Sequence, residues 1–170
     1  MSDRTRSIEL LNKAIGEELA AVHQYMYFHF RLDDMGYDLL ASYFKRTAIA
    51  EMMHIEELAE RILFLKGEVE MIASDKVKKI HDSDGMLKLA CEMENASVEH
   101  YNAWSGECGA NADAISKQLF EKLVSQEEVH FDQFETEMDN LEKFGSHYLA
   151  LQSIERSKKI ISGGAADKAE

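Results

Sequence analysis

Four long segments of the chain carry apolar side chains at alternating steps of three and four residues. This spacing is typical of α-helices that turn one side toward a core. We expect helices over about residues 5–36, 38–66, 83–108 and 113–144, with Gly67 as the C-cap of the second and Ser83 or Asp84 as the N-cap of the third. Residues 146–157 carry a further, short helical pattern.

The segment between the second and third helices has mixed polarity and weak periodicity, and it covers residues 68–82. About 15 extended residues can span roughly 50 Å. A helix of about 28 residues is roughly 42 Å long. This segment can therefore cross the whole bundle, which predicts that the second and third helices begin at the same end.

Polar side chains interrupt the middle of each apolar stripe, where an uncompensated charge is costly. The first and third stripes each contain one glutamate, and the second and fourth each contain a Glu-x-x-His motif. Positions i and i+3 of a helix share one face, so the two side chains of such a motif can hold one metal ion. The six polar residues are Glu18, Glu51, His54, Glu94, Glu127 and His130.

The two halves of the chain align when 76 is subtracted from the residue numbers of the second half. Glu94 then falls on Glu18, Tyr101 falls on Tyr25, and the second Glu-x-x-His motif falls on the first. The halves are therefore expected to form two helical hairpins related by an approximate two-fold axis. The inward Glu and His side chains should meet near the middle of the bundle.

The six residues suit a pair of metal ions. One glutamate from each of two helices, with one Glu-x-x-His motif from each of the other two, is the ligand set of di-iron carboxylate bundles. Two divalent cations would neutralise the carboxylates, and hard oxygen donors with some nitrogen suit iron or manganese. We expect Glu18 and Glu94 as terminal ligands, Glu51 and Glu127 as bridges, and one histidine on each metal. The alternative is a buried polar network without metal, which would need several protons to stay neutral.

Composition and charge agree with this interpretation. The chain has no proline, 45% hydrophobic and 30% charged residues, which favours long helices. The net charge of −13 argues against a nucleic-acid partner and suits attraction of cations, although solubility alone also explains it. No apolar run approaches the roughly 20 residues of a membrane helix, and residues 1–8 lack an apolar signal region. We expect a cytoplasmic protein with one domain over residues 1–157 and a flexible tail over 158–170.

At the six polar residues the sequence resembles the bacterioferritin branch of the ferritin superfamily. The order Glu, Glu-x-x-His, Glu, Glu-x-x-His matches, as do Glu-Arg-Ile-Leu-Phe-Leu at 60–65, the long crossover and the short helical pattern after Gly145. The resemblance covers about residues 5–157. It implies an all-α fold: a ferritin-like antiparallel four-helix bundle with one long crossover and a short fifth C-terminal helix.

The resemblance also implies a function. A cage-forming ferroxidase would bind two iron ions per subunit, with manganese or zinc as substitutes, and oxidise iron(II) with dioxygen or peroxide. The mineral would be stored in the hollow homo-oligomer, which protects against oxidative stress. Tyr25 matches a tyrosine that the family keeps near its di-iron site, and a core tyrosine with a hydrogen-bonded hydroxyl is the alternative. Met52 matches the methionine that ligates haem between two subunits, and a methionine packed at an interface is the alternative.

Two cysteines bear on the ferritin subgroup to which the sequence is assigned. Cys91 and Cys108 lie on one predicted stripe, and Cys91 is one turn before Glu94. This resembles the Dps-like, or thioferritin, subgroup, which has a redox cysteine pair and cages of 12 subunits; the haem-containing bacterioferritins have 24. On a straight helix the thiols would be about 25 Å apart. A disulfide needs Cα atoms within about 7 Å, so it would require a break in the helix. Two buried apolar thiols are the alternative, and we favour the Dps-like subgroup.

Two other functions compete with iron storage. A rubrerythrin-like di-iron peroxidase would share the ligands, but rubrerythrins carry paired Cys-x-x-Cys motifs, which this sequence lacks. A DNA-compacting shell would need more positive charge than Lys158, Lys159 and Lys168 supply on so acidic a chain.

Overall fold

The computed structural model describes residues 4–145, 147–151, 154 and 158. All regular secondary structure in these residues is helical. The four long helices are α1 (Thr5–Asp34), α2 (Asp38–Phe64), α3 (Ser83–Ala110) and α4 (Ala114–Phe144). Each lies within a few residues of its predicted range, which confirms the all-α fold class.

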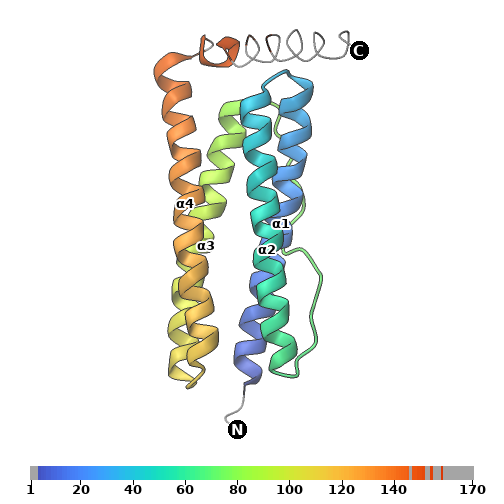
Figure 1. The fold of residues 1–170 in the computed structure, drawn as a ribbon, viewed down its shortest axis with the longest axis vertical. Coiled ribbons are helices and arrows are strands. Elements are labelled where there is room, and N and C mark those ends of the chain that lie inside the picture. Colours follow the sequence, from blue (N-terminus) through green and yellow to red (C-terminus); the bar gives the residue numbers. More distant parts are fainter. Residues whose placement is uncertain (1–3, 146, 152–153, 155–157, 159–170) are drawn as a thin grey trace, which may run out of the picture.

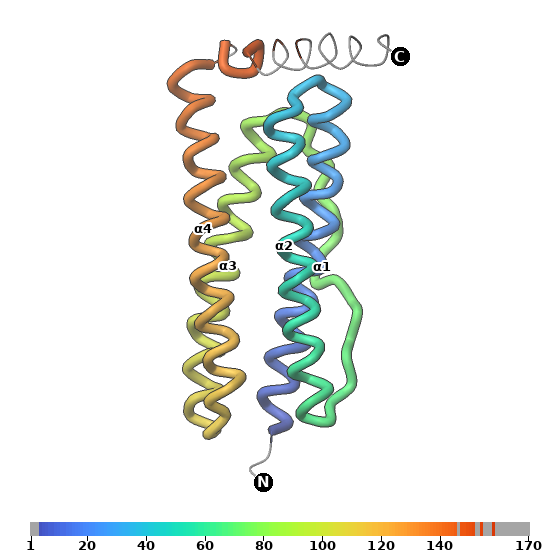
Figure 2. The backbone as a smooth tube through the Cα atoms, viewed as in Figure 1, coloured from blue at the N-terminus to red at the C-terminus, as the bar shows by residue number. Residues whose placement is uncertain are grey.

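The helices form two antiparallel hairpins that pack side by side (Figure 1). Helix α1 packs chiefly on α2 and α3 on α4, while contacts from α1 to α3 and from α2 to α4 join the hairpins. The crossover between α2 and α3 returns along the length of the bundle, so both helices begin at the same end (Figure 2). This is the topology that the length of residues 68–82 predicts.

Backbone and side-chain hydrogen bonds fix the crossover to α1. The Asn12 amide group donates to the carbonyl of Glu68 and accepts from the N–H of Glu70, both at 2.9 Å. Further along, the N–H of Ser74 donates to the carbonyl of Gly16 at 2.8 Å. The crossover can approach so closely because Gly16 has no side chain: a Cβ there would lie 3.2 Å from the carbonyl oxygen of Ile72.

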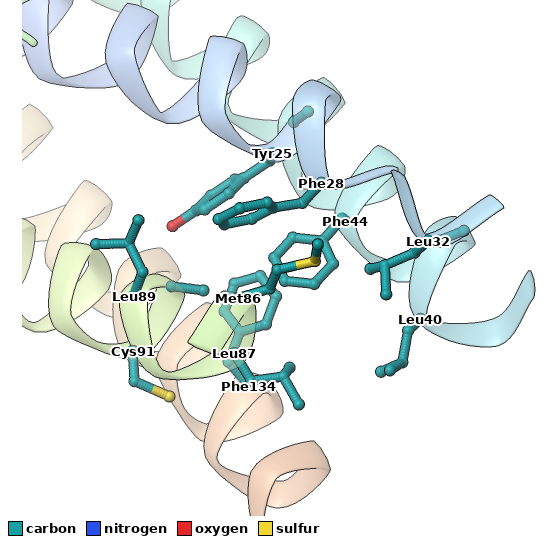
Figure 3. Packing of buried hydrophobic residues seen from close by; sticks show 13 residues of the cluster. Tyr25, Phe28, Leu32, Leu40, Phe44, Met86, Leu87, Leu89, Cys91 and Phe134 are labelled. Carbon is teal, nitrogen blue, oxygen red and sulfur yellow. The ribbon is translucent and has the colours of Figure 1, made fainter. Parts of the chain in front are cut away.

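Two apolar clusters fill the bundle, one toward each end. The first gathers aromatic rings from three helices, with Phe28 of α1, Phe44 of α2 and Phe134 of α4 around Tyr25 (Figure 3). The ring centroids of Phe44 and Phe134 are 4.9 Å apart, a distance at which aromatic pairs attract. The second cluster contains Leu10, Leu11, Ile15, Leu58, Ile62, Tyr101, Phe120 and Leu123, among others. Along each of the four helices, the polar residues singled out in the sequence come between the residues of one cluster and those of the other.

The end of α2 corrects one prediction. Lys66, not Gly67, adopts the left-handed backbone conformation, with φ of 65°. The N–H groups of Lys66 and Gly67 close the helix on the carbonyls of Leu63 and Ile62, both at 3.0 Å, as in a Schellman motif. Gly67 is needed for packing instead, because a Cβ there would lie only 2.7 Å from Cγ2 of Ile8.

The start of α3 differs by one residue from the prediction. The N-cap is Asp82 rather than Ser83 or Asp84, and its carboxylate accepts from the N–H of Gly85 at 2.7 Å. Aspartate is a favoured cap because its oxygen satisfies an N–H that the first helical turn leaves free. Sequence alone placed three suitable polar residues side by side here, and only the backbone conformation selects one.

Beyond Gly145, residues 147–151 are helical and turn away from the axis of α4 (Figure 1). This agrees with the predicted short fifth helix. Residues 152–153, 155–157 and 159–170 lie outside the described residues, so the flexible tail over 158–170 and the domain boundary at 157 stay predictions. Within the described chain, none of the helices combines the length and apolar character that crossing a membrane requires.

Replacing Gly67 with alanine should destabilise the protein. The added Cβ would overlap Cγ2 of Ile8 at 2.7 Å and press on Cγ2 of Ile62 at 3.0 Å. Overpacking of this kind costs about 1–3 kcal/mol. Urea unfolding of the Gly67→Ala variant measures this loss.

The matched control is Gly106→Ala, within α3, where a Cβ would meet no atom within 4 Å. Alanine favours a helix over glycine by about 1 kcal/mol, so this variant should be as stable as the parent or more so. Equal stability of the two variants would show that Gly67 is not required by packing.

Candidate metal centre

The structure brings all six predicted polar residues together at the centre of the bundle. Five are almost fully buried, with 1–3% of their surface exposed, and the side chain of His130 is 12% exposed. They form two overlapping sets of four whose donor atoms lie within 4.8 Å of one another. One set is Glu18, Glu51, His54 and Glu127, and the other is Glu51, Glu94, Glu127 and His130.

Each histidine turns Nδ1 toward three carboxylates. His54 Nδ1 lies 2.9 Å from Glu51 Oε2, 3.1 Å from Glu127 Oε1 and 3.4 Å from Glu18 Oε1. The surroundings of His54 thus include carboxylates from α1, α2 and α4. An imidazole enclosed by oxygen atoms of this kind can share a cation with them.

The second histidine repeats the arrangement from the opposite hairpin. His130 Nδ1 lies 3.0 Å from Glu51 Oε1, 3.2 Å from Glu127 Oε2 and 3.8 Å from Glu94 Oε2. Glu51 and Glu127 therefore direct one oxygen toward each histidine. This is the geometry expected of carboxylates that bridge two metal ions, with Glu18 and Glu94 at the two ends.

Several of these buried atoms have no hydrogen-bond partner among the residues that the structure describes. They are both carboxylate oxygens of Glu51, Oε1 of Glu127 and both ring nitrogens of His54. The short distances to His54 are therefore contacts without hydrogen-bond geometry. Buried polar atoms without partners are costly. Donor atoms that converge without bonding to one another suit hard or borderline divalent cations, so the residues present fit a pair of metal ions.

Without a metal, the carboxylates at the two ends of the site favour their neutral forms. Burial, followed by the charges of Glu51 and Glu127, raises the pKa of Glu18 well above its ordinary value. Burial and the charge of Glu51 raise the pKa of Glu94 in the same way. The charged ligand set is thus unfavourable on its own, and a cation has to compensate it.

At Glu127 and the two histidines, the pKa shifts favour the charged form instead. Burial disfavours the charged form of Glu127, but His130 and His54 outweigh it and lower the pKa of Glu127 to about 2. Burial also disfavours charged histidine, yet the carboxylates of Glu127, Glu51 and Glu94 raise the pKa of His130 to about 12. The pKa of His54 is raised by its carboxylates as well. Metal-free, the histidines hold the protons that metal ions would replace.

Two buried tyrosines fix the terminal carboxylates. The hydroxyl of Tyr25 donates to Glu94 Oε1 at 2.5 Å, and the hydroxyl of Tyr101 donates to Glu18 Oε1 at 2.7 Å. Each tyrosine therefore reaches across to the other hairpin, and the ring of Tyr25 rests in the first apolar cluster (Figure 3). Tyr101 was not among the predicted site residues, although its alignment with Tyr25 in the 76-residue repeat was the available signal.

The cysteines do not form a pair within the chain. Helix α3 runs unbroken from Ser83 to Ala110, so Cys91 and Cys108 are separated by 17 residues of helix, or about 25 Å. Both are free, buried thiols, in different apolar clusters. Burial, with Glu135 and Glu94, raises the pKa of Cys91 to about 11, and burial raises that of Cys108. The break in the helix that an intrachain disulfide would require is absent from the described residues.

Met52 lies on the outer side of α2, away from the metal-binding residues. Its side chain is 50% exposed, and the neighbouring Ile49 and Met53 are also exposed, at 46% and 51%. An exposed thioether on an apolar face has no packing role inside the chain. It is available to a haem or to a second subunit.

Replacing Glu18 with glutamine should separate metal binding from folding. Because the fold raises the pKa of Glu18, its contribution to stability is present below the ordinary value of 4.5 and lost as pH rises. The amide stays neutral and can still accept from Tyr101. The melting temperature of metal-free Glu18→Gln should therefore equal or exceed that of the parent at pH 7, and zinc(II) should raise it less.

Glu56→Gln is the control, because Glu56 is exposed on α2. It should leave both the metal-free melting temperature and the zinc-dependent rise unchanged. A Glu18→Gln variant that melts well below the parent, yet gains as much from zinc, would contradict the assignment of Glu18 as a ligand.

Comparisons with known proteins show the family to which the chain belongs. The family described as ferritin-like domain matches residues 8–144. The bacterioferritin of Desulfovibrio desulfuricans is 36% identical over 153 residues, which is 86% of this chain and 82% of that protein. The bacterioferritin of Brucella melitensis is 34% identical over 146 residues, covering 85% and 90% of the two chains.

A solved structure matches the fold. The X-ray structure of the Desulfovibrio desulfuricans bacterioferritin, which describes its diiron site in different catalytic states, superposes with a TM-score of 0.87 at 35% identity, covering 88% of each chain. These relatives are bacterioferritins, and they give no support to the Dps-like (thioferritin) subgroup that the cysteines suggested. The fold, the six polar residues and the relatives together show that this chain belongs to the bacterioferritin branch of the ferritin-like family.

Proposed function

We propose that the protein is a ferroxidase that oxidises iron(II) at an intrasubunit two-metal site and stores the product. The single observation that carries this proposal is the position of Glu51 and Glu127, which belong to both ligand sets. Two iron(II) ions bound on shared carboxylates are held close enough to react with the same oxidant molecule. The bacterioferritin relatives support the same function.

The protein residues bind, orient and balance charge. Glu18 with His54, and Glu94 with His130, would each hold one iron ion, while the four carboxylates neutralise the two positive charges of each ion. Tyr101 and Tyr25 keep the terminal carboxylates in position through their hydroxyl groups. Since these positions are set before metal arrives, little reorganisation is needed on binding.

The oxidant must accept two electrons, one from each iron(II). Dioxygen with two protons would give hydrogen peroxide, and hydrogen peroxide with two protons would give two water molecules. Both balance with two iron(II) becoming two iron(III). Consumption of free iron(II) and of peroxide would protect the cytoplasm against oxidative stress.

Storage requires a cage. The bacterioferritin relatives favour a homo-oligomer, and they remove the reason for expecting 12 subunits, which rested on the cysteine pair. We propose the 24-subunit cage that the resemblance to bacterioferritins implies, with mineral in its interior.

Replacing Glu127 with alanine should abolish rapid iron(II) oxidation. The variant loses the carboxylate that is shared by both metal ions. Mutating even an outer partner of a metal ligand lowers activity about 10–100-fold, so we expect the oxidation rate to fall about 100-fold or more. Stopped-flow absorbance of iron(III) formation, after anaerobic loading with two iron(II) per chain, measures the rate.

The adjacent Glu128→Ala variant is the control, because Glu128 is exposed on the same helix. It removes the same charge without touching the site and should oxidise iron(II) at the parent rate. Unchanged oxidation in Glu127→Ala would rule out the ferroxidase assignment.

Haem is a second cofactor that Met52 would hold. We propose that Met52 from each of two subunits ligates one haem, which its exposure on an apolar face of α2 permits. Protein purified with haem should show a Soret band at one haem per two chains in a 24-subunit particle, and Met52→Leu should lose the band while keeping the particle mass. A band that survives this substitution would place haem elsewhere.

A further inference from the structure

A cavity of about 270 Å³ opens between α1, α3 and the crossover and extends to the candidate metal centre. Its inner end is formed by the carboxylates of Glu18, Glu51, Glu94 and Glu127. Small side chains along its walls, among them Ala20, Ala21, Ala96 and Ser97, leave the passage open. The metal centre is buried in the bundle, so a cation needs such a passage to reach it from solvent.

A carboxylate–imidazole pair stands at the outer part of this cavity. His100 Nδ1 lies 2.9 Å from Glu17 Oε1, with the two side chains 50% and 24% exposed. The ring of His100 stacks on Trp104 at a centroid distance of 5.4 Å and an interplanar angle of 18°, which restricts its orientation. No ligand residue lies at helical spacing from His100, because its partner Glu17 belongs to a different helix.

The crossover forms a fixed wall beside this pair. The buried amide of Gln24 donates to the carbonyl of Lys78 at 3.0 Å and accepts from its N–H at 2.7 Å. With the bond from Ser74 to Gly16, this fastens the crossover to α1 at two points along the cavity. The opening is therefore defined by packed backbone rather than by a free loop.

The charges along the cavity favour a cation. Six acidic residues line it against two lysines, Lys76 and Lys78, which are exposed on the crossover. At the inner end, Glu51 and Glu127 present buried oxygens without hydrogen-bond partners among the described residues. A passage with acidic walls and low-dielectric surroundings concentrates cations and raises their rate of arrival.

We propose that Glu17 and His100 form a transit site at the mouth of this cavity, where iron(II) binds on its way to the metal centre. This inference rests on the proposed function. One carboxylate oxygen and one imidazole nitrogen suit iron(II), and the remaining coordination positions stay with water. Binding by two protein ligands is weak, so the cation can move on to Glu18, the neighbour of Glu17 in the chain.

A second cavity, of about 260 Å³, reaches His130 from the opposite side, between α2 and α4. It is lined by Tyr43, Arg46, Thr47, Ala50, Val129, His130 and Gln133. Apart from His130, these residues supply no metal ligand, and Arg46 opposes a cation. This cavity is the alternative route, and it provides a matched control.

Cobalt(II) uptake by the assembled metal-free protein tests the route without oxidation chemistry. Stopped-flow absorbance gives the rate of uptake, and titration gives the number of ions bound per chain. Ala96→Leu narrows the proposed route and Ala50→Leu narrows the alternative one; both alanines are partly buried and gain the same side chain. We expect uptake to slow in Ala96→Leu, because the larger side chain obstructs the cavity, and to stay unchanged in Ala50→Leu.

Glu17→Gln and His100→Gln test the transit site itself. Each should slow uptake about tenfold at low cobalt(II), the low end of the range for electrostatic focusing. The effect should shrink at high cobalt(II), while two ions still bind per chain and the melting temperature stays unchanged. Glu92→Gln, an exposed glutamate of α3 outside the cavity, controls for the lost charge. It should take up cobalt(II) at the parent rate.

The outcomes separate the two proposals. Parent rates in Glu17→Gln and His100→Gln would overturn the transit site. Slow uptake in Ala50→Leu with fast uptake in Ala96→Leu would overturn the route on which the transit site depends. Both results would leave the ferroxidase assignment intact. Fewer than two cobalt(II) ions per chain in the unmodified protein would contradict the two-metal site. The proposed route would then fail as well, because it would have no such site to supply.

Discussion

Burial of four carboxylates and two imidazoles in an apolar bundle is the constraint on which the rest of the structure depends. Two aromatic and aliphatic clusters exclude water on either side of them. In these surroundings, charge must be balanced locally. Without metal, protons do this: the pKa of Glu18 and Glu94 rises, and the histidines become cations. The metal-free site therefore keeps buried carboxylate and imidazole atoms without hydrogen-bond partners among the described residues. Divalent cations would supply the missing partners.

The approximate two-fold axis doubles each feature of the site. Glu18 and Glu94, the two Glu-x-x-His motifs, and the two tyrosines each occupy equivalent places in the hairpins. The tyrosines are exchanged across the axis, so that each hairpin positions a candidate ligand of the other. The surroundings of the two halves are not equivalent, however. Among the residues that the structure describes, the cavity that ends on the four buried carboxylates lies on the side formed by α1, α3 and the crossover, and the crossover has no counterpart in the second half.

Several features followed from the sequence for physical reasons. The alternation of three- and four-residue steps predicted four helices, and the length of residues 68–82 predicted a crossover along the bundle. Other features were invisible there. The sequence predicts Gly67 as a helix C-cap, but Lys66 takes the left-handed conformation there and Gly67 is required for packing against Ile8. The cysteines suggested a redox pair and a Dps-like cage, yet a continuous α3 keeps them apart. The proximity of Cys91 to Glu94 in the sequence does not bring Cys108 any closer to Cys91.

By itself, the sequence determined the helices and the candidate ligand residues, because a helix converts spacing along the chain directly into a shared face. Polar residues at buried positions on four such faces leave few arrangements other than a common centre. The tertiary structure alone decided which groups from different helices meet: the bond from Tyr101 to Glu18, the pair of Glu17 and His100, and the cavity beneath the crossover. These depend on how the helices are offset and rotated against each other, and the periodicity of one helix carries no information about its partner's offset.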